Sequence, residues 1–318
     1  MEPRSTVIEI GRAAARLRAG DLVVFPTETV YGLGANAGDP RAVARIFEAK
    51  GRPRFNPLIV HLSDIDQLHT IAREIPALAL RLAEAFWPGP LTLLLPRAPG
   101  VPDLVTAGLD TVGVRIPQHP VARALITAAG VPVAAPSANP YQAVSPTRVE
   151  DLDKTIVACA AAVIDGGPCA VGVESTVVGF DDSGRAVLHR LGGLPVEELE
   201  RITGALLAPG PGVASPGRGT RHYSPARAKI LLEPDLDPGR RPHTRLLCLR
   251  AIPEDEAYAD VRELSPSGDL RDAARNLFTM LNTLDRESDL PIAVRLVPAT
   301  GLGAAINDRL LRATGAGG

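Results

Sequence analysis

The sequence predicts an α/β protein with two domains, and three observations support this prediction. Short apolar runs that suit buried strands alternate with stretches whose apolar residues recur at helical spacing. A segment rich in proline and glycine, residues 208–225, interrupts this alternation, and a shorter alternation follows it. A chain of 318 residues is long enough for two cores. We therefore expect a first domain at 1–206, a linker at 207–226 and a second domain at 227–318.

The first domain is predicted to open with a helix over residues 6–18, followed by a strand over 21–25. Residues 26–40 are rich in turn formers and predict a loop, and 41–50 predicts a second helix. Further strands are expected at 57–62, 91–95, 112–116, 132–136, 161–165, 175–180 and 186–191, and a helix at 196–206. Such alternation implies a sheet that is buried on both faces over at least part of its width.

The second domain is predicted to be a smaller α/β unit. The runs KILLE at 229–233, TRLLCLR at 244–250 and IAVRLV at 292–297 predict strands. Residues 268–287 and 304–313 have the apolar spacing of helices.

Composition narrows the class of function. A formal net charge of −2 argues against a protein whose main role is to hold nucleic acid, because that role normally requires a basic face. The cysteines Cys159, Cys169 and Cys248 are widely spaced and are interpreted as buried apolar residues rather than metal ligands. No signal-peptide core and no run of about 18 apolar residues is found, so we expect the cytoplasm as the location.

Cations are concentrated in the segment KGRPRFNP, residues 50–57. Lys50, Arg52 and Arg54 lie at the end of a predicted helix and in the stiff loop that follows it. Taken alone, this pattern favours compensation of the helix dipole on a solvated surface. As a binding site, it would hold phosphate or carboxylate.

Polar residues also follow several predicted strands, where ligands of open α/β sheets bind. The residues are Thr27, Thr29 and Tyr31 in PTETVYGLG, Ser137 and Asn139 in PSANPYQAVSPT, and Glu174, Ser175 and Thr176 in GGPCAVGVESTVV. On their own, the first two of these groups favour an ordinary loop or turn, and the third is equally compatible with a cap or turn.

Several common catalytic motifs are missing from the sequence. There is no GxxxxGK[ST], and the GLG pieces lack the strand and helix context of a dinucleotide-binding loop. There is also no HExxH and no GxSxG. Any nucleotide must therefore be held without a P-loop, and peptidase or esterase chemistry loses support.

Taken together, these segments resemble the threonylcarbamoyl-AMP synthase family with its YrdC-type domain. The resemblance covers about residues 7–205 and is carried by PTETVYGLG, AKGRPRFNPLIVHL, FWPGPLTLLL, VGVRIP, PSAN and GVESTVV. The segment SPGRGTRHYSP and the ending GLGAAINDRL resemble the long form of the family, which adds a C-terminal domain. The resemblance implies a twisted mixed sheet around a deep cavity, plus a smaller Rossmann-like α/β domain.

The implied activity is the synthesis of L-threonylcarbamoyladenylate and pyrophosphate from L-threonine, bicarbonate and ATP, for the threonylcarbamoyladenosine modification of tRNA. Mg²⁺ is expected to accompany ATP, with no protein ligand assigned to it and no organic cofactor. A tRNA threonylcarbamoyl transferase is the expected downstream partner, tRNA itself is not expected to bind tightly, and no membrane partner is expected.

The resemblance also implies roles for particular residues. The pattern KxR followed by SxN maps the catalytic group onto Lys50, Arg52, Ser137 and Asn139. The implied threonine-binding residues are Thr29, Tyr31, Arg52 and His61. The implied nucleotide-binding residues are Lys50, Ser137, Asn139, Ser175 and Arg190.

Arg218, His222 and Tyr223 of the linker resemble the lid of long-form members. Gly219 and Thr220 depart from that pattern, which has a basic and an aromatic residue there.

Two other readings remain minor alternatives. The first is an RNA-binding module without catalysis, which the net charge and the lack of an RNA-binding motif oppose. The second is carbamoyl transfer in another pathway, which would require further domains that this sequence does not contain.

Overall fold

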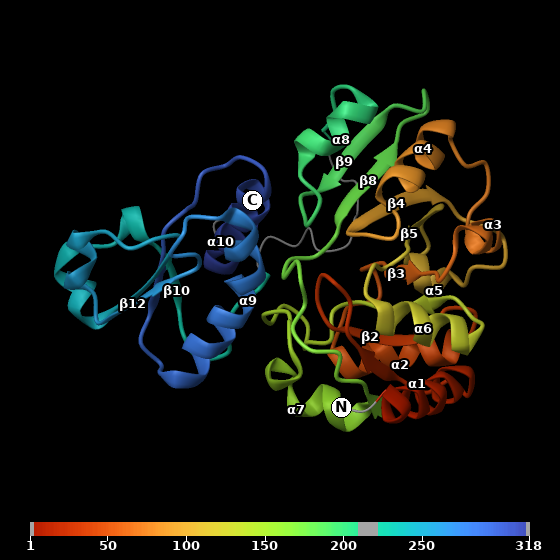
Figure 1. Cartoon of the computed structure of the whole chain (residues 1–318), viewed down its shortest axis with the longest axis horizontal. Coiled ribbons are helices and arrows are strands. Elements are labelled where there is room, and N and C mark those ends of the chain that lie inside the picture. Colours follow the sequence, from red (N-terminus) through yellow and green to blue (C-terminus); the bar gives the residue numbers. More distant parts are fainter. Residues whose placement is uncertain (1–2, 209–221, 316–318) are drawn as a thin grey trace.

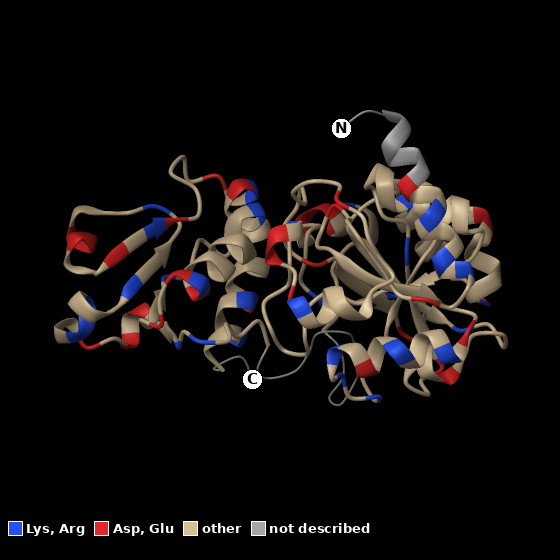
Figure 2. Cartoon of the chain, turned by 90° about the horizontal axis from the view of Figure 1, so that it is seen from below, with Lys and Arg blue, Asp and Glu red and all other residues tan. Residues whose placement is uncertain are grey.

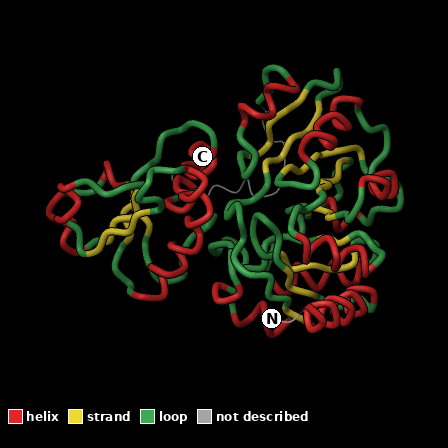
Figure 3. Tube along the Cα trace, viewed as in Figure 1, coloured by secondary structure: helices red, strands yellow, loops and turns green. Residues whose placement is uncertain are grey.

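The structure is a computed structural model that describes residues 3–208 and 222–315. It contains two separate sheets, one in each half of the molecule (Figure 1), which confirms the expected α/β class and the second, smaller α/β unit. Strands gather at the centre of each half and helices lie outside them (Figure 3). The proposed linker 207–226 falls between the two sheets, and its residues 209–221 lie outside the described residues.

The larger sheet has nine strands in the order β7-β1-β2-β6-β3-β5-β4-β8-β9. It is mixed, because parallel pairs such as β3 with β5 occur beside antiparallel pairs such as β4 with β5. The strands are β1 Val23–Phe25, β2 Gly32–Asn36, β3 Ile59–His61, β4 Leu91–Pro96, β5 Thr111–Arg115, β6 Val133–Ala134, β7 Ala162–Val163, β8 Thr176–Phe180 and β9 Ala186–Arg190.

Helices cover both faces of this sheet. They are α1 Pro3–Arg18, α2 Pro40–Lys50, α3 Leu68–Ile71, α4 Ala77–Phe86, α5 Asp103–Thr106, α6 Pro120–Ala129, α7 Lys154–Cys159 and α8 Val196–Thr203. In β1, Val23 and Phe25 pack with α1 and α6, whereas Val24 joins the core formed with α2. This strand is therefore buried on both faces, as its continuous apolar run predicted.

Strand β2 corrects the prediction of a loop over the whole of 26–40. Its sequence, GLGAN, has weak strand propensity, yet it pairs antiparallel with β1 at Val24 and Leu33. A Cβ at Gly34 would lie 2.7 Å from the Phe25 ring and 2.9 Å from Val133. Glycine is needed here because neighbouring side chains fill the space above the backbone.

The second domain is a four-stranded parallel sheet in the order β10-β13-β11-β12. Its strands are β10 Ile230–Leu232, β11 Arg245–Cys248, β12 Asp260–Glu263 and β13 Ile292–Val294, and its main helices are α9 Leu270–Glu287 and α10 Leu302–Thr314. Strand β12 was not predicted, because DVRE is a polar, half-buried edge strand without an apolar run.

Helices α9 and α10 lie on the side of the second domain that faces the first (Figure 1). One apolar cluster spans the boundary, since it joins Val30, Val144 and Val173 to residues of α9 and α10. Polar contacts add to it: Thr147 and Thr279 share a hydrogen bond of 2.7 Å, and Arg286 pairs with Asp151 at 3.0 Å. The two domains are therefore packed against each other through a common core.

Two further observations bear on the composition. Cys169 and Cys248 are buried as predicted, but Cys159 is exposed because it lies in the last turn of the short helix α7. Lys and Arg are interspersed with Asp and Glu along both domains (Figure 2). In the described part of the chain, no helix is both long enough and apolar enough to cross a membrane.

Candidate functional site

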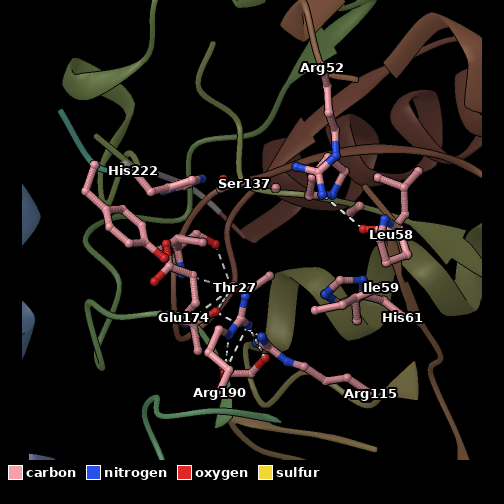
Figure 4. Close-up of a pocket in the computed structure, with 18 residues that line it drawn as sticks. Thr27, Arg52, Leu58, Ile59, His61, Arg115, Ser137, Glu174, Arg190 and His222 are labelled. Carbon is pink, nitrogen blue, oxygen red and sulfur yellow. Dashed lines mark hydrogen bonds between the residues drawn. The ribbon is translucent and has the colours of Figure 1, made fainter. Parts of the chain in front are cut away.

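A polar cavity opens in the first domain where the loops that follow several strands converge (Figure 4). Residues from the loop after β1, the segment after α2, the ends of β3, β5 and β9, and the start of β8 contribute to it. Its lining consists of Thr27, Thr29, Val30, Gly32, Arg52, Pro57, Leu58, Ile59, His61, Arg115, Ala135, Pro136, Ser137, Glu174, Ser175, Arg190, His222 and Tyr223.

Three guanidinium groups, those of Arg52, Arg115 and Arg190, reach this cavity. Arg52 approaches from one side, and Arg115 and Arg190 from the other (Figure 4). Burial and, to a smaller extent, the neighbouring Arg190 lower the pKa of Arg52 to about 10, so Arg52 stays charged at neutral pH. An enclosed group of cations of this kind suits an anionic ligand such as phosphate or carboxylate.

Arg115 was not singled out from the sequence. Parallel pairing of β3 with β5 sets His61 opposite Arg115, so both side chains lie at the same end of the sheet. The Arg115 guanidinium pairs with Glu28 at 2.9 Å and donates to Thr29 Oγ1 at 3.0 Å. Its sequence signal was an arginine at the end of the apolar run VGVRI, in the motif VGVRIP.

Arg190 and Ser175 are held together by the antiparallel pair β8 and β9. Arg190 donates from Nε to the Ser175 carbonyl at 3.1 Å, and from Nη2 to that carbonyl at 2.9 Å and to Ser175 Oγ at 3.1 Å. Ser175 Oγ also shares a hydrogen bond of 2.7 Å with Thr92. The structure thus brings together two of the residues predicted to bind a nucleotide.

Glu174 contributes a carboxylate to the same cavity. Its Oε1 accepts from Ser145 Oγ at 2.7 Å and its Oε2 accepts from Arg309 Nε at 3.0 Å. Burial alone would raise the pKa of Glu174, but Arg309, Arg190 and the Ser145 hydrogen bond together lower it to about 2. Glu174 is therefore ionised although it is buried.

Lys50 ends helix α2, as predicted, and contacts the PSAN loop. It is buried, it is not among the lining residues, and its Nζ donates to the backbone carbonyls of Ser137, at 2.6 Å, and of Asn139. Burial and the nearby Arg52 lower its pKa. In this arrangement Lys50 holds the PSAN loop in place, and its expected contact with a triphosphate stays a prediction.

Asn139 and Tyr31 are likewise not among the lining residues. Asn139 Nδ2 donates to the carbonyls of Pro140 and Ala143, both at 2.9 Å, because the loop turns back on itself there. The Tyr31 hydroxyl donates to the Gly167 carbonyl at 2.8 Å. Both side chains therefore support loops, and their expected contacts with substrate stay predictions.

The other predicted residues of the first domain, Thr29, Arg52, His61 and Ser137, do line the cavity. Burial and the neighbouring Arg115 lower the pKa of His61 to about 3, so this imidazole is neutral at physiological pH. Thr27, which the sequence analysis gave only as part of a polar loop, also lines the cavity. Its hydroxyl shares a hydrogen bond of 2.8 Å with the hydroxyl of Thr29.

Two of the three predicted lid residues reach the cavity. His222 and Tyr223 line it, and Tyr223 stacks on Phe278 of α9 with ring centroids 5.2 Å apart. Arg218 lies outside the described residues. Among the residues with described positions, no group of three or more His, Cys, Asp or Glu side chains is arranged to hold a metal ion.

Two family models together match almost the whole chain. One, described as "Telomere recombination" and covering Sua5, YciO and YrdC, matches residues 15–192. The other, described as "Threonylcarbamoyl-AMP synthase, C-terminal domain", matches residues 194–315.

Similar proteins match over nearly their full lengths. A threonylcarbamoyl-AMP synthase from Pyrococcus abyssi is 44% identical over 319 residues, covering 95% of this chain and 93% of that protein. The threonylcarbamoyl-AMP synthase from Bacillus subtilis is 40% identical over 325 residues, covering 96% and 93%. The crystal structure of P. abyssi Sua5 complexed with L-threonine has a TM-score of 0.88 at 39% identity, covering 98% of this chain and 95% of that one.

Proposed function

The chain belongs to the Sua5, YciO and YrdC family in its long form, and we propose that it makes L-threonylcarbamoyladenylate and pyrophosphate from L-threonine, bicarbonate and ATP. The observation that carries this proposal is the enclosed cavity into which Arg52, Arg115 and Arg190 converge beside the hydroxyls of Thr29, Ser137 and Ser175. Threonine, bicarbonate and ATP are all carriers of negative charge, which such a lining stabilises.

The reaction joins these substrates in two bond-forming steps. The neutral threonine amine attacks the carbon of bicarbonate, with loss of water, or of carbon dioxide derived from it, with loss of a proton, and forms an N-carboxylate. An oxygen of this carbamate then attacks the α-phosphorus of ATP, and pyrophosphate leaves. Chemistry at phosphorus requires chiefly positioning and neutralisation of charge, which guanidinium groups supply. Mg²⁺ enters bound to the triphosphate as part of the substrate.

The residues divide into two groups under this proposal. Arg52, Thr29 and His61 bind threonine, with the planar guanidinium on the carboxylate. Arg190, Ser175, Ser137 and Arg115 face the nucleotide. Lys50, Asn139 and Tyr31 act indirectly, through the loops that they hold. A closed site also shields the carbamate, which water destroys.

The cellular setting of the reaction is proposed on the same basis. We expect a cytoplasmic enzyme that passes its adenylate to a tRNA threonylcarbamoyl transferase without binding tRNA tightly itself. The interspersed charges of both domains favour this over an RNA-binding module (Figure 2). Carbamoyl transfer in another pathway has no specific observation in its favour.

Pyrophosphate release from ATP tests the proposal. We expect turnover that requires threonine, bicarbonate and Mg²⁺ together, because the carbamate is the nucleophile and Mg²⁺ neutralises the leaving group. Each component is omitted in turn, and serine replaces threonine in a further arm. Equal turnover with serine, or without any amino acid, would refute the proposed substrate.

A further inference from the structure

An arginine of the second domain contacts a residue that lines the cavity of the first domain. Arg309 lies on α10 and is fully buried, and its Nε donates to Glu174 Oε2 at 3.0 Å. Glu174 lines the cavity next to Ser175. The two partners are 135 positions apart in the chain, so this contact forms only when the domains pack together.

The surroundings of Arg309 show what this buried cation contacts. Its Nη1 donates to the neighbouring Asp308 at 2.7 Å, and its guanidinium carbon lies 5.4 Å from the centre of the Tyr223 ring. Its Nη2 has no hydrogen-bond partner within the described residues. A charge buried this deeply is costly unless it is paired, so the contact with Glu174 is central to keeping it there.

Charge balance within the cavity explains why the pairing matters. Arg115 is already paired with Glu28 at 2.9 Å. Without a counter-ion of its own, Glu174 would cancel part of the positive charge that Arg52 and Arg190 present to an anion. With Arg309 attached, the pair is close to neutral.

We propose that Arg309 is a positioning residue of the catalytic cavity: it serves as the counter-ion of Glu174, and thereby preserves the positive charge of the cavity for an anionic substrate. The second domain thus contributes a residue that sets the charge of the site. This inference rests on the proposed function in one respect, since it takes ATP as the anion.

The groups that face Glu174 define the expected pH dependence. They are Arg309 of α10, Arg190 of β9, Ser145 of the loop before α7, and His222 of the linker end. In Arg309→Met, burial is opposed by fewer cations, so the pKa of Glu174 rises. Because this pKa is higher, Glu174 carries less negative charge at pH 5.5 than at pH 8. Any loss of anion binding is therefore largest at pH 8 and shrinks as the pH falls.

The experiment measures calorimetric binding of Mg²⁺-ATP to the full chain, without threonine, at pH 8 and pH 5.5, relative to the unsubstituted protein. We expect Arg309→Met to weaken binding about tenfold at pH 8, with a smaller deficit at pH 5.5. The double variant R309M/E174Q, which also removes the negative charge of Glu174, should bind Mg²⁺-ATP at least about threefold more tightly than Arg309→Met at pH 8. Arg309→Lys, which keeps the charge, should also bind normally.

Arg245→Met is the matched control. Arg245 is a buried arginine of the same domain, but its guanidinium donates to the carbonyls of Leu284, Ser288 and Leu290, away from the cavity. The Arg245→Met substitution should lower the unfolding temperature without changing the affinity for ATP. Should Arg309→Met fail to fold, Arg309→Lys and Arg309→Gln are compared in its place, because lysine keeps the positive charge and glutamine removes it.

Several results would overturn the inference. These are unchanged binding by Arg309→Met, a deficit that does not depend on pH, a double variant as weak as Arg309→Met, or an equal loss in Arg245→Met. Because binding is measured apart from turnover, an unsubstituted protein that binds ATP but releases no pyrophosphate refutes the proposed function alone. One that binds no ATP refutes both.

Discussion

Arg52 illustrates how a single side chain can support a loop and also face a ligand. Its Nε donates to the Asn56 carbonyl at 3.2 Å and its Nη2 to the Pro57 carbonyl at 3.0 Å. Two corners of the guanidinium thus hold the stiff segment after α2, while the side chain lines the cavity. A planar group with five N–H donors can do both, whereas the ammonium of lysine is a point charge with three.

We therefore predict that Arg52→Lys weakens threonine binding by about tenfold although the charge is kept. Isothermal titration calorimetry with threonine measures the effect. Arg54→Lys is the control, because Arg54 is exposed and is not among the lining residues. Unchanged affinity in Arg52→Lys would place the threonine carboxylate elsewhere.

At the scale of elements, the end of α2 determines where Arg52 lies. Gly51 caps this helix in the left-handed region at φ 59°, and its N–H donates to the Glu48 carbonyl at 3.2 Å. Arg52 N–H donates to the Phe47 carbonyl at 2.9 Å in the same turn. The chain can leave the helix in this direction because glycine adopts a positive φ without strain.

Gly51→Ala is predicted to lower the free energy of unfolding by about 1 kcal/mol. The cause is backbone strain rather than a clash, since an added Cβ has no atom within 4 Å. Urea denaturation measures it. Gly100→Ala is the control, because its Cβ is equally unhindered and its φ is not positive. Equal effects of the two substitutions would show that the cap does not need glycine.

At the scale of the whole molecule, the linker end connects the cavity to the second domain. The His222 ring lies 4.1 Å from the Tyr223 ring, and Tyr223 stacks on Phe278 and lies beside Arg309. Both residues line the cavity. Their position is compatible with the lid role expected from the sequence, and such segments commonly exclude water when they close.

The double variant H222A/Y223A is predicted to lose turnover by tenfold or more, while threonine affinity changes by less than about threefold. The reason is that the proposed threonine contacts come from the first domain. Steady-state pyrophosphate release and threonine calorimetry separate the two effects.

Tyr258→Ala is the control, since this buried tyrosine of the second domain also has an arginine, Arg241, 5.4 Å from its ring centre. Equal losses of turnover in both variants would point to general destabilisation. Full activity of the double variant would exclude a lid function for these two residues.

The local pattern of the sequence was enough to predict most elements and the segments of the site. Continuous apolar runs predicted β1, β4 and β5, and the motifs around Arg52, Ser137 and Ser175 predicted which loops form the cavity. Strand β2 was not predictable in this way, because glycine has a low strand propensity. Its Gly34 is required instead by the close packing of Phe25 and Val133. These successes have a common reason: periodicity and turn chemistry are encoded within a few neighbouring residues.

Only the tertiary structure decided which side chains enter the cavity and which support it. Lys50 ends helix α2, and Asn139 and Tyr31 lie in the predicted loops. The polar side-chain atoms of all three donate to backbone carbonyls of loops. The contact of Arg309 with Glu174 was likewise beyond any local pattern, because it joins two domains that the sequence predicted only as separate units. The direction of a side chain and the partner of a buried charge depend on packing between segments that are distant in the sequence. The spacing of residues within a short segment does not predict that packing.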